Sequence, residues 1–131
     1  MSKKIAVRLG QFADNGVKAE QQDFHGAGLP EGYILTQKGI VCAIADGISS
    51  SNVSHIASET AVSSFIQDYY STPDSWSVKT SAERVIRSIN SWLYSQTQQS
   101  QDRFDKDRGY VCSFSSLVLK HNQAHLFHIG D

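Results

Sequence analysis

The sequence predicts an α+β domain in which strands near both ends of the chain flank two consecutive long helices. Strand-like apolar segments lie before residue 46 and after residue 110, and two strongly periodic helical segments lie between them. The regular alternation of strand and helix that marks a doubly wound sheet is missing. With 131 residues, the chain is long enough for one domain with a substantial core.

Two strands are predicted in the first part of the chain. From Lys4 to Leu9, apolar residues alternate with polar or small ones, a period of two that is typical of a strand with one buried face. A turn signal around Gly16 separates this segment from a second strand-like segment, Gln21 to Gly26, which contains Asp23.

The stretch that organises the chain is Gly39 to Ser51. Its apolar run, Ile40–Ala45, is unbroken and ends at Asp46-Gly47, which predicts a strand buried on both faces. Tyr33–Thr36 precedes this run across a short turn, so we expect the two segments to form a hairpin.

Two amphipathic helices are predicted in the middle of the chain. The first follows Ser51 and Asn52, either of which can cap it, and ends near Tyr70, before Pro73. The second carries an apolar stripe from Ala82 to Leu93 and begins at Ser77 or Thr80. The polar segment 96–107 is expected to fray into a solvated linker.

The chain returns to strand after this linker. We expect strands from Tyr110 to Leu119 and from Ala124 to Ile129, joined by a turn at His121-Asn122. The two helices would cover one face of the resulting sheet. The apolar strands require a second cover, and the sequence offers too few strands to build another sheet for that purpose.

Composition limits the classes of function. The net charge of -1 gives no indication of nucleic-acid or membrane-surface binding, and no apolar run is long enough to span a bilayer. No hydrophobic signal segment follows Met1, so a cytoplasmic location is expected. Cys42 and Cys112 each lie in an apolar run. A single disulfide and two buried thiols are both open, and a cytosolic location favours the thiols.

Asp46 is the first candidate for a functional residue. A carboxylate at the end of a buried strand is rigidly supported and still reaches the surface, which suits a catalytic or metal-binding acid. The plainer interpretation is an Asp-Gly turn followed by a serine helix cap.

Three motifs, taken in order, resemble the N-terminal part of the metal-dependent PP2C (PPM) family of serine/threonine phosphatases, in particular its bacterial branch. The first is the segment Gly16-Val-Lys-Ala-Glu-Gln-Gln-Asp23, which is similar to the family's G-x-R-x-x-N-[EQ]-D. The second is Ile44-Ala-Asp46-Gly47, similar to V-x-D-G. The third is the strand that ends in Gly130-Asp131, similar to the family's G-D-S-R. The resemblance implies an α-β-β-α sandwich, of which residues 1–131 would supply antiparallel strands and two long antiparallel helices.

The resemblance also implies a chemistry and a set of site residues. PP2C-like enzymes use two Mn²⁺ or Mg²⁺ ions, and in some cases a third, to hydrolyse phosphoserine and phosphothreonine in protein substrates. Asp23 and Asp46 would be the catalytic acids and metal ligands, and the Gly47 carbonyl a further ligand. Asp131 would belong to the third metal. Lys18 would bind the substrate phosphate in place of the usual arginine, or be an ordinary surface lysine.

The sequence departs from the family pattern at several positions in these motifs. Ser49 and Ser50 replace glycines of D-G-x-G-G, Ile48 replaces a histidine proposed as general acid in many eukaryotic members, and Gln21 replaces an asparagine. The family's further acids would lie beyond residue 131, so we expect a partial domain that is inactive alone and prone to self-association. The alternative is a non-catalytic module that binds a partner or regulates a fused or separate kinase domain.

Overall fold

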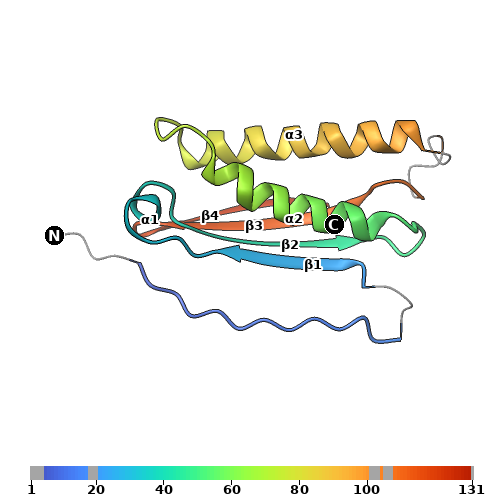
Figure 1. The fold of residues 1–131 in the computed structure, drawn as a ribbon, viewed down its shortest axis with the longest axis horizontal. Helices are drawn as coiled ribbons and strands as arrows, with labels where there is room; N and C mark the ends of the chain where they lie inside the picture. Colours follow the sequence, from blue (N-terminus) through green and yellow to red (C-terminus); the bar gives the residue numbers. More distant parts are fainter. Residues whose placement is uncertain (1–4, 18–20, 101–103, 105–107, 131) are drawn as a thin grey trace.

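The computed structural model describes residues 5–17, 21–100, 104 and 108–130. Its centre is a four-stranded antiparallel sheet in the order β1-β2-β3-β4, and two long helices lie on one side of it (Figure 1). The predicted α+β class, with strands on either side of two consecutive helices, is therefore confirmed. The elements in chain order are β1 (Asp23–Gly28), α1 (Gly32–Lys38), β2 (Ile40–Gly47), α2 (Ser54–Tyr70), α3 (Val78–Gln99), β3 (Cys112–Lys120) and β4 (Gln123–Ile129).

The core lies between α2 and the sheet. Phe65 and Val62 of α2 are completely buried, and the ring of Phe65 lies 5.1 Å, centroid to centroid, from that of Phe114 on β3. On β1, a Cβ at Gly28 would lie 2.5 Å from a ring carbon of Tyr70, so this strand needs a glycine to pass under α2. The close packing of strand against helix keeps β1 and β2 in fixed register.

Helix α3 runs antiparallel to α2 and packs mainly on it (Figure 1). It begins at the Ser77 cap, whose hydroxyl accepts a hydrogen bond from the Thr80 N–H at 3.1 Å, and it extends to Gln99. The prediction that segment 96–107 frays is wrong for residues 96–99, which are helical, and residues 101–103 and 105–107 of that segment lie outside the described residues. The Thr97 hydroxyl donates to the Leu93 carbonyl and accepts from the Tyr110 N–H, which joins the last turn to the chain before β3.

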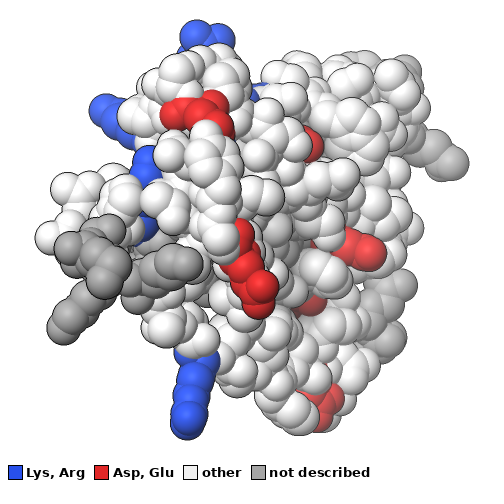
Figure 2. Space-filling view, turned by 60° about the vertical axis from the view of Figure 1, so that its left-hand side comes forward, with Lys and Arg blue, Asp and Glu red and all other residues white. Residues whose placement is uncertain are grey.

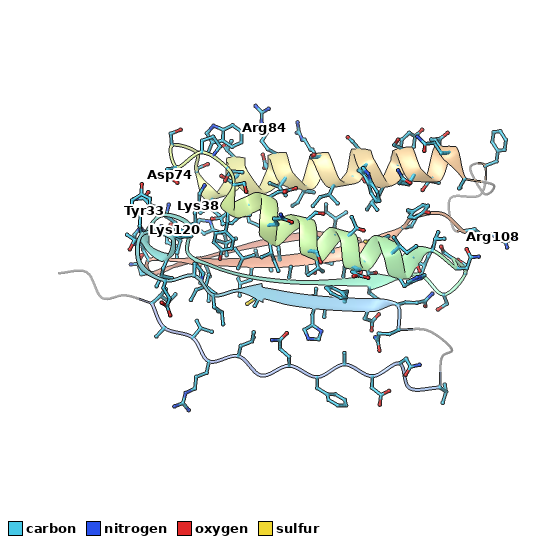
Figure 3. All side chains as sticks on the ribbon, in the orientation of Figure 1. Tyr33, Lys38, Asp74, Arg84, Arg108 and Lys120 are labelled. Atoms are coloured by element: carbon cyan, nitrogen blue, oxygen red, sulfur yellow. The ribbon has the colours of Figure 1, made fainter. Side chains whose placement is uncertain are left out.

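One predicted strand is wrong, because Tyr33–Thr36 lies within the short helix α1 instead of a hairpin. Contacts distant in sequence hold this helix (Figure 3): the Tyr33 hydroxyl donates to Asp74 at 2.8 Å, and the Lys38 ammonium donates to Thr72 at 2.7 Å. The Tyr69 hydroxyl also donates to the Lys38 carbonyl at 2.7 Å. These partners lie in the last turn of α2 or just after it, so local alternation could not indicate them.

Strand β2 is covered on one face only, so the prediction of burial on both faces is wrong. Val41 and Ala45 point toward α2 and are 0% and 1% exposed, whereas Ile44 on the other face is 54% exposed. The apolar run therefore behaves as a half-buried strand of an antiparallel sheet. We call the face that carries Ile44 the open face.

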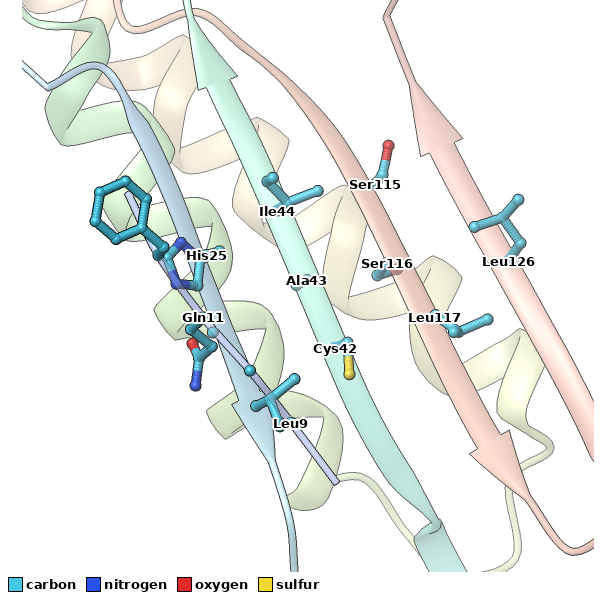
Figure 4. A pocket seen from close by; sticks show the side chains of 13 residues that line it. Leu9, Gln11, His25, Cys42, Ala43, Ile44, Ser115, Ser116, Leu117 and Leu126 are labelled. Atoms are coloured by element: carbon cyan, nitrogen blue, oxygen red, sulfur yellow. The ribbon is translucent and has the colours of Figure 1, made fainter. Parts of the chain in front are cut away.

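The N-terminal segment lies beside the open face and is not paired in the sheet (Figures 1 and 4). The predicted strand Lys4–Leu9 is thus not formed over residues 5–9, and Lys4 lies outside the described residues. Leu9 and Phe12 lie across a shallow cavity of about 400 Å³ from Leu126 and Leu117. Among the described residues this segment pairs with no strand of the sheet, so alternation alone does not produce a strand here.

The two cysteines lie on neighbouring strands, β2 and β3. Cys42 and Cys112 are free thiols, as the sequence favours, but they are half-buried where buried thiols were predicted. Cys42 points to the open face, and Cys112, paired in register with Gly47, points to the helices. No helix of the described chain is both long and apolar enough to cross a membrane.

Candidate functional site

Asp23 and Asp46 face each other across β1 and β2. The antiparallel register pairs them directly, and both side chains are exposed on the open face. The β-carbons of directly opposed residues lie about 4.5–5.5 Å apart, and like charges at that spacing repel each other. A pair of carboxylates in this position is chemically suited to a cation with oxygen ligands.

Gln22 fixes the end of β1 next to this acid pair. Its side chain is 8% exposed, and its amide donates to the carbonyls of Ile48 at 3.0 Å and Ser51 at 3.2 Å. The Gln22 carbonyl in turn accepts the Gly47 N–H at 3.0 Å. The residue before Asp23 is therefore tied to both sides of the loop that follows Asp46.

Gly47 is required for this arrangement. A Cβ at this position would lie 2.6 Å from the Ser54 hydroxyl and 3.0 Å from the Gln22 carbonyl. Both contacts are closer than van der Waals distance, so no larger side chain fits without moving α2 or β1. The glycine after Asp46 thus brings the start of α2 against the end of the sheet.

Ser51 and Ser54 hold the loop that follows Gly47. The Ser51 hydroxyl lies 2.7 Å from the carbonyl of Gly109 and accepts the Val53 N–H at 3.2 Å. The Ser54 hydroxyl donates to the Ile48 carbonyl at 2.9 Å. Ser51 therefore holds the turn before α2. The prediction that Ser51 or Asn52 caps this helix is wrong, because α2 begins at Ser54 and its N-cap residue is Val53, with no side-chain cap hydrogen bond.

β3 and the end of β4 complete this end of the sheet. Ser113 is the register partner of Asp46 on β3, and a Cβ at Gly130 would lie 2.9 Å from that of Ser113. Gly130 has a φ of +110°, which favours glycine. The residue that precedes Asp131 therefore lies at the same end of the sheet as Asp46.

The structure brings together only part of the predicted site. Lys18 and Asp131 lie outside the described residues. Within residues 5–17, 21–100, 104 and 108–130, no group of three or more His, Cys, Asp or Glu side chains is placed to hold a metal ion. The acidic ligands that the structure describes are thus Asp23 and Asp46. Carboxylate oxygens are the kind of ligand that a hard divalent cation prefers, but two carboxylates are too few to complete its coordination.

The electrostatic influence of Asp46 reaches β3. Burial raises the pKa of the Cys112 thiol to about 11, and the negative charge of Asp46 adds to the shift. The thiol is consequently a poor nucleophile at neutral pH.

The sequence identified Asp23, Asp46 and Gly47 but missed Gln22 as a supporting residue. Gln22 stands inside the first motif, immediately before Asp23, and that position was the available signal. Its partners lie 26 to 32 residues away, so its role depends on the packing of α2 against the sheet.

The fold and these motifs agree with the comparison with known families. The family model described as Protein phosphatase 2C matches residues 16–131, so the chain belongs to the protein phosphatase 2C family. The resemblance inferred from the three motifs is confirmed at this level. Comparisons with curated proteins and with solved structures gave no match.

Proposed function

We propose that the chain is part of a metal-dependent phosphatase domain that hydrolyses phosphoserine and phosphothreonine in proteins. The observation that supports this most directly is the pairing of Asp23 and Asp46 on the open face. Two opposed carboxylates repel each other, and a cation bound between them would turn that repulsion into attraction. Because the chain belongs to the protein phosphatase 2C family, we expect such a cation to take part in phosphate hydrolysis.

Asp23 and Asp46 would hold Mn²⁺ or Mg²⁺ through their carboxylates, with the Gly47 carbonyl as a further oxygen ligand. When bound, a pair of such ions supplies a nucleophilic hydroxide at neutral pH and stabilises charge on the phosphoryl oxygens. Gln22 would act by holding the β1 end and the loop after Gly47 in place, so that the two carboxylates keep a fixed separation.

Two further residues belong to the proposal on the basis of the motifs. Lys18 would contact the substrate phosphate as a point charge, in the position where the family has arginine. Asp131, which follows Gly130, would bind a third and weaker ion. Both assignments extend the site beyond the residues that the structure describes.

We also propose that the complete catalytic domain extends beyond these 131 residues. Two divalent ions require more oxygen ligands than two carboxylates and a carbonyl provide. On the open face, Ile44 is 54% and Leu126 is 72% exposed, and further protein would bury them. The 131-residue chain by itself would therefore lack turnover and would self-associate through this face.

The test is a phosphatase assay on a longer protein that carries these residues, with a phosphoserine peptide at saturating Mn²⁺. Asp46→Asn keeps the shape and removes one ligand charge, so kcat should fall by at least ~10²-fold, the scale of a lost electrostatic stabiliser. Asp68→Asn, at an exposed acid on α2, is the matched control and should leave kcat unchanged. Near wild-type turnover in Asp46→Asn would refute the proposal.

A further inference from the structure

Helix α3 carries a basic region on the side of the molecule away from the acid pair. All charged residues of this 22-residue helix lie in its first half, and they are Lys79, Glu83, Arg84 and Arg87. Three are basic and one is acidic, which gives a net charge of +2 in a chain whose net charge is -1. The first half of α3 therefore carries a local excess of positive charge.

Four of the side chains near the start of α3 surround a hollow. The hollow has a volume of about 350 Å³ and is lined by Thr80, Glu83, Arg84 and Arg87. Residues three and four apart share one face of a helix, so both guanidinium groups and the threonine hydroxyl lie on the same side. We call this the α3 hollow. Figure 2, a view with the left-hand side of Figure 1 brought forward, shows basic side chains projecting along its left margin while acidic ones lie mainly across its middle and right.

The position of Arg84 is fixed by an aromatic ring. Its guanidinium carbon lies 5.7 Å from the centre of the Trp76 ring, within the range of a cation–π contact. Figure 3 shows Arg84 on the outer side of α3, turned away from the sheet. The contact with Trp76 restrains the guanidinium, so less entropy is lost when an anion binds to its N–H groups.

The acid in the hollow does not neutralise the arginines. Glu83 and Arg87 are four residues apart, a spacing that commonly gives an ion pair on a helix. Among the described residues, the structure gives no ion pair for Glu83, Arg84 or Arg87. The two guanidinium groups therefore have unused N–H donors, and Glu83 repels any anion that enters.

We propose that the α3 hollow docks a phosphorylated segment of the protein substrate. Guanidinium groups bind phosphate through two parallel N–H bonds, and Thr80 adds a hydroxyl donor. The overall negative charge of the chain and the presence of Glu83 favour one compact anionic group over the extended phosphate backbone of a nucleic acid. This inference rests on the proposed function, because a phosphorylated protein binds to the α3 hollow only if phosphoproteins are the substrates of this domain.

The docked segment would be distinct from the one that is hydrolysed. α3 packs against α2 and contacts β4 on the helical side of the sheet, whereas the acid pair lies on the opposite face (Figure 1). Phosphate held at Arg84 and Arg87 is therefore not presented to Asp23 and Asp46. Such contact would increase the affinity for substrates that carry a second phosphate, without a change in the chemical step.

The experiment measures binding of a fluorescein-labelled phosphoserine peptide to the 131-residue chain by fluorescence anisotropy, with the unphosphorylated peptide alongside. The double variant Arg84→Ala, Arg87→Ala should weaken binding by about tenfold or more. Glu83→Gln should tighten it about twofold, because a repulsive charge is removed. Arg8→Ala, at an exposed arginine of the N-terminal segment, is the matched control and should have no effect.

The outcomes separate this inference from the proposed function. Equal affinity of wild-type protein and double variant, or a weaker affinity in Glu83→Gln, would overturn the docking site. Tighter binding of a single-stranded RNA of equal charge would assign the hollow to nucleic acid and overturn it as well. Because binding is measured without turnover, loss of affinity in the double variant would support docking even if Asp46→Asn left the phosphatase assay unchanged.

Discussion

Gln22 offers a sharp test of how the acid pair is held in place. In Gln22→Met the side chain keeps its length and loses its amide, which removes hydrogen bonds to the Ile48 and Ser51 carbonyls at 3.0 and 3.2 Å. The Ile48 carbonyl keeps the Ser54 hydroxyl at 2.9 Å, whereas the Ser51 carbonyl keeps it only at 3.5 Å. In the variant the Ile48 carbonyl therefore still accepts a short hydrogen bond, whereas the buried Ser51 carbonyl becomes a poorly satisfied acceptor.

The expected loss of stability follows from these contacts. A net hydrogen bond contributes about 1 kcal/mol and an unsatisfied buried acceptor costs about 1–3 kcal/mol, so we expect a destabilisation of about 2 kcal/mol. For a domain of this size that corresponds to a fall in Tm of about 6–8 °C.

Thermal unfolding followed by circular dichroism measures the effect on the 131-residue chain. Gln67→Met, at an exposed glutamine of α2, controls for the change from amide to thioether and should stay within about 0.5 kcal/mol of wild type. If Gln22→Met and Gln67→Met unfold at the same temperature, the amide of Gln22 does not hold the loop, and the reasoning about the support of Asp23 fails.

Two further predictions concern charge at the site. At pH 8 about one Cys112 thiol in a thousand is ionised if its pKa is about 11, so alkylation by iodoacetamide should be slow and should accelerate as the pH rises toward that value. Asp46→Asn removes a charge that raises this pKa and should therefore speed alkylation at pH 8, while an unchanged rate measured by mass spectrometry would contradict the link. For Lys18, we expect Lys18→Ala to raise the KM for phosphopeptide, and Lys18→Arg to preserve or lower it because a guanidinium bonds phosphate bidentately. Identical steady-state kinetics in all three forms would make Lys18 a plain surface residue.

The sequence was sufficient for elements whose pattern is local. The apolar periodicity of α2 and α3 and the unbroken run of β2 each predicted the correct type of element. α1 was missed because Tyr33–Thr36 has no helical period, and its position depends on contacts with residues 69 to 74. The burial of β2 was overestimated because an apolar run does not reveal which faces are covered.

For the site, the sequence named the acids but could not predict their geometry. Asp23 and Asp46 are 23 positions apart, and only the register of β1 with β2 makes them direct neighbours. A shift of the pairing by one residue would have turned Asp23 toward α2. The support from Gln22 is likewise a consequence of packing.

The measurement that tests the central claim most directly is calorimetric titration of Mn²⁺ into a longer protein that carries these residues. If the opposed carboxylates form a cation site, Asp46→Asn should weaken Mn²⁺ binding by at least about tenfold, since it removes one of two ligand charges. Asp68→Asn should bind as wild type does. Equal Mn²⁺ affinity and stoichiometry in wild type and Asp46→Asn would show that the pair Asp23 and Asp46 is not where the metal binds.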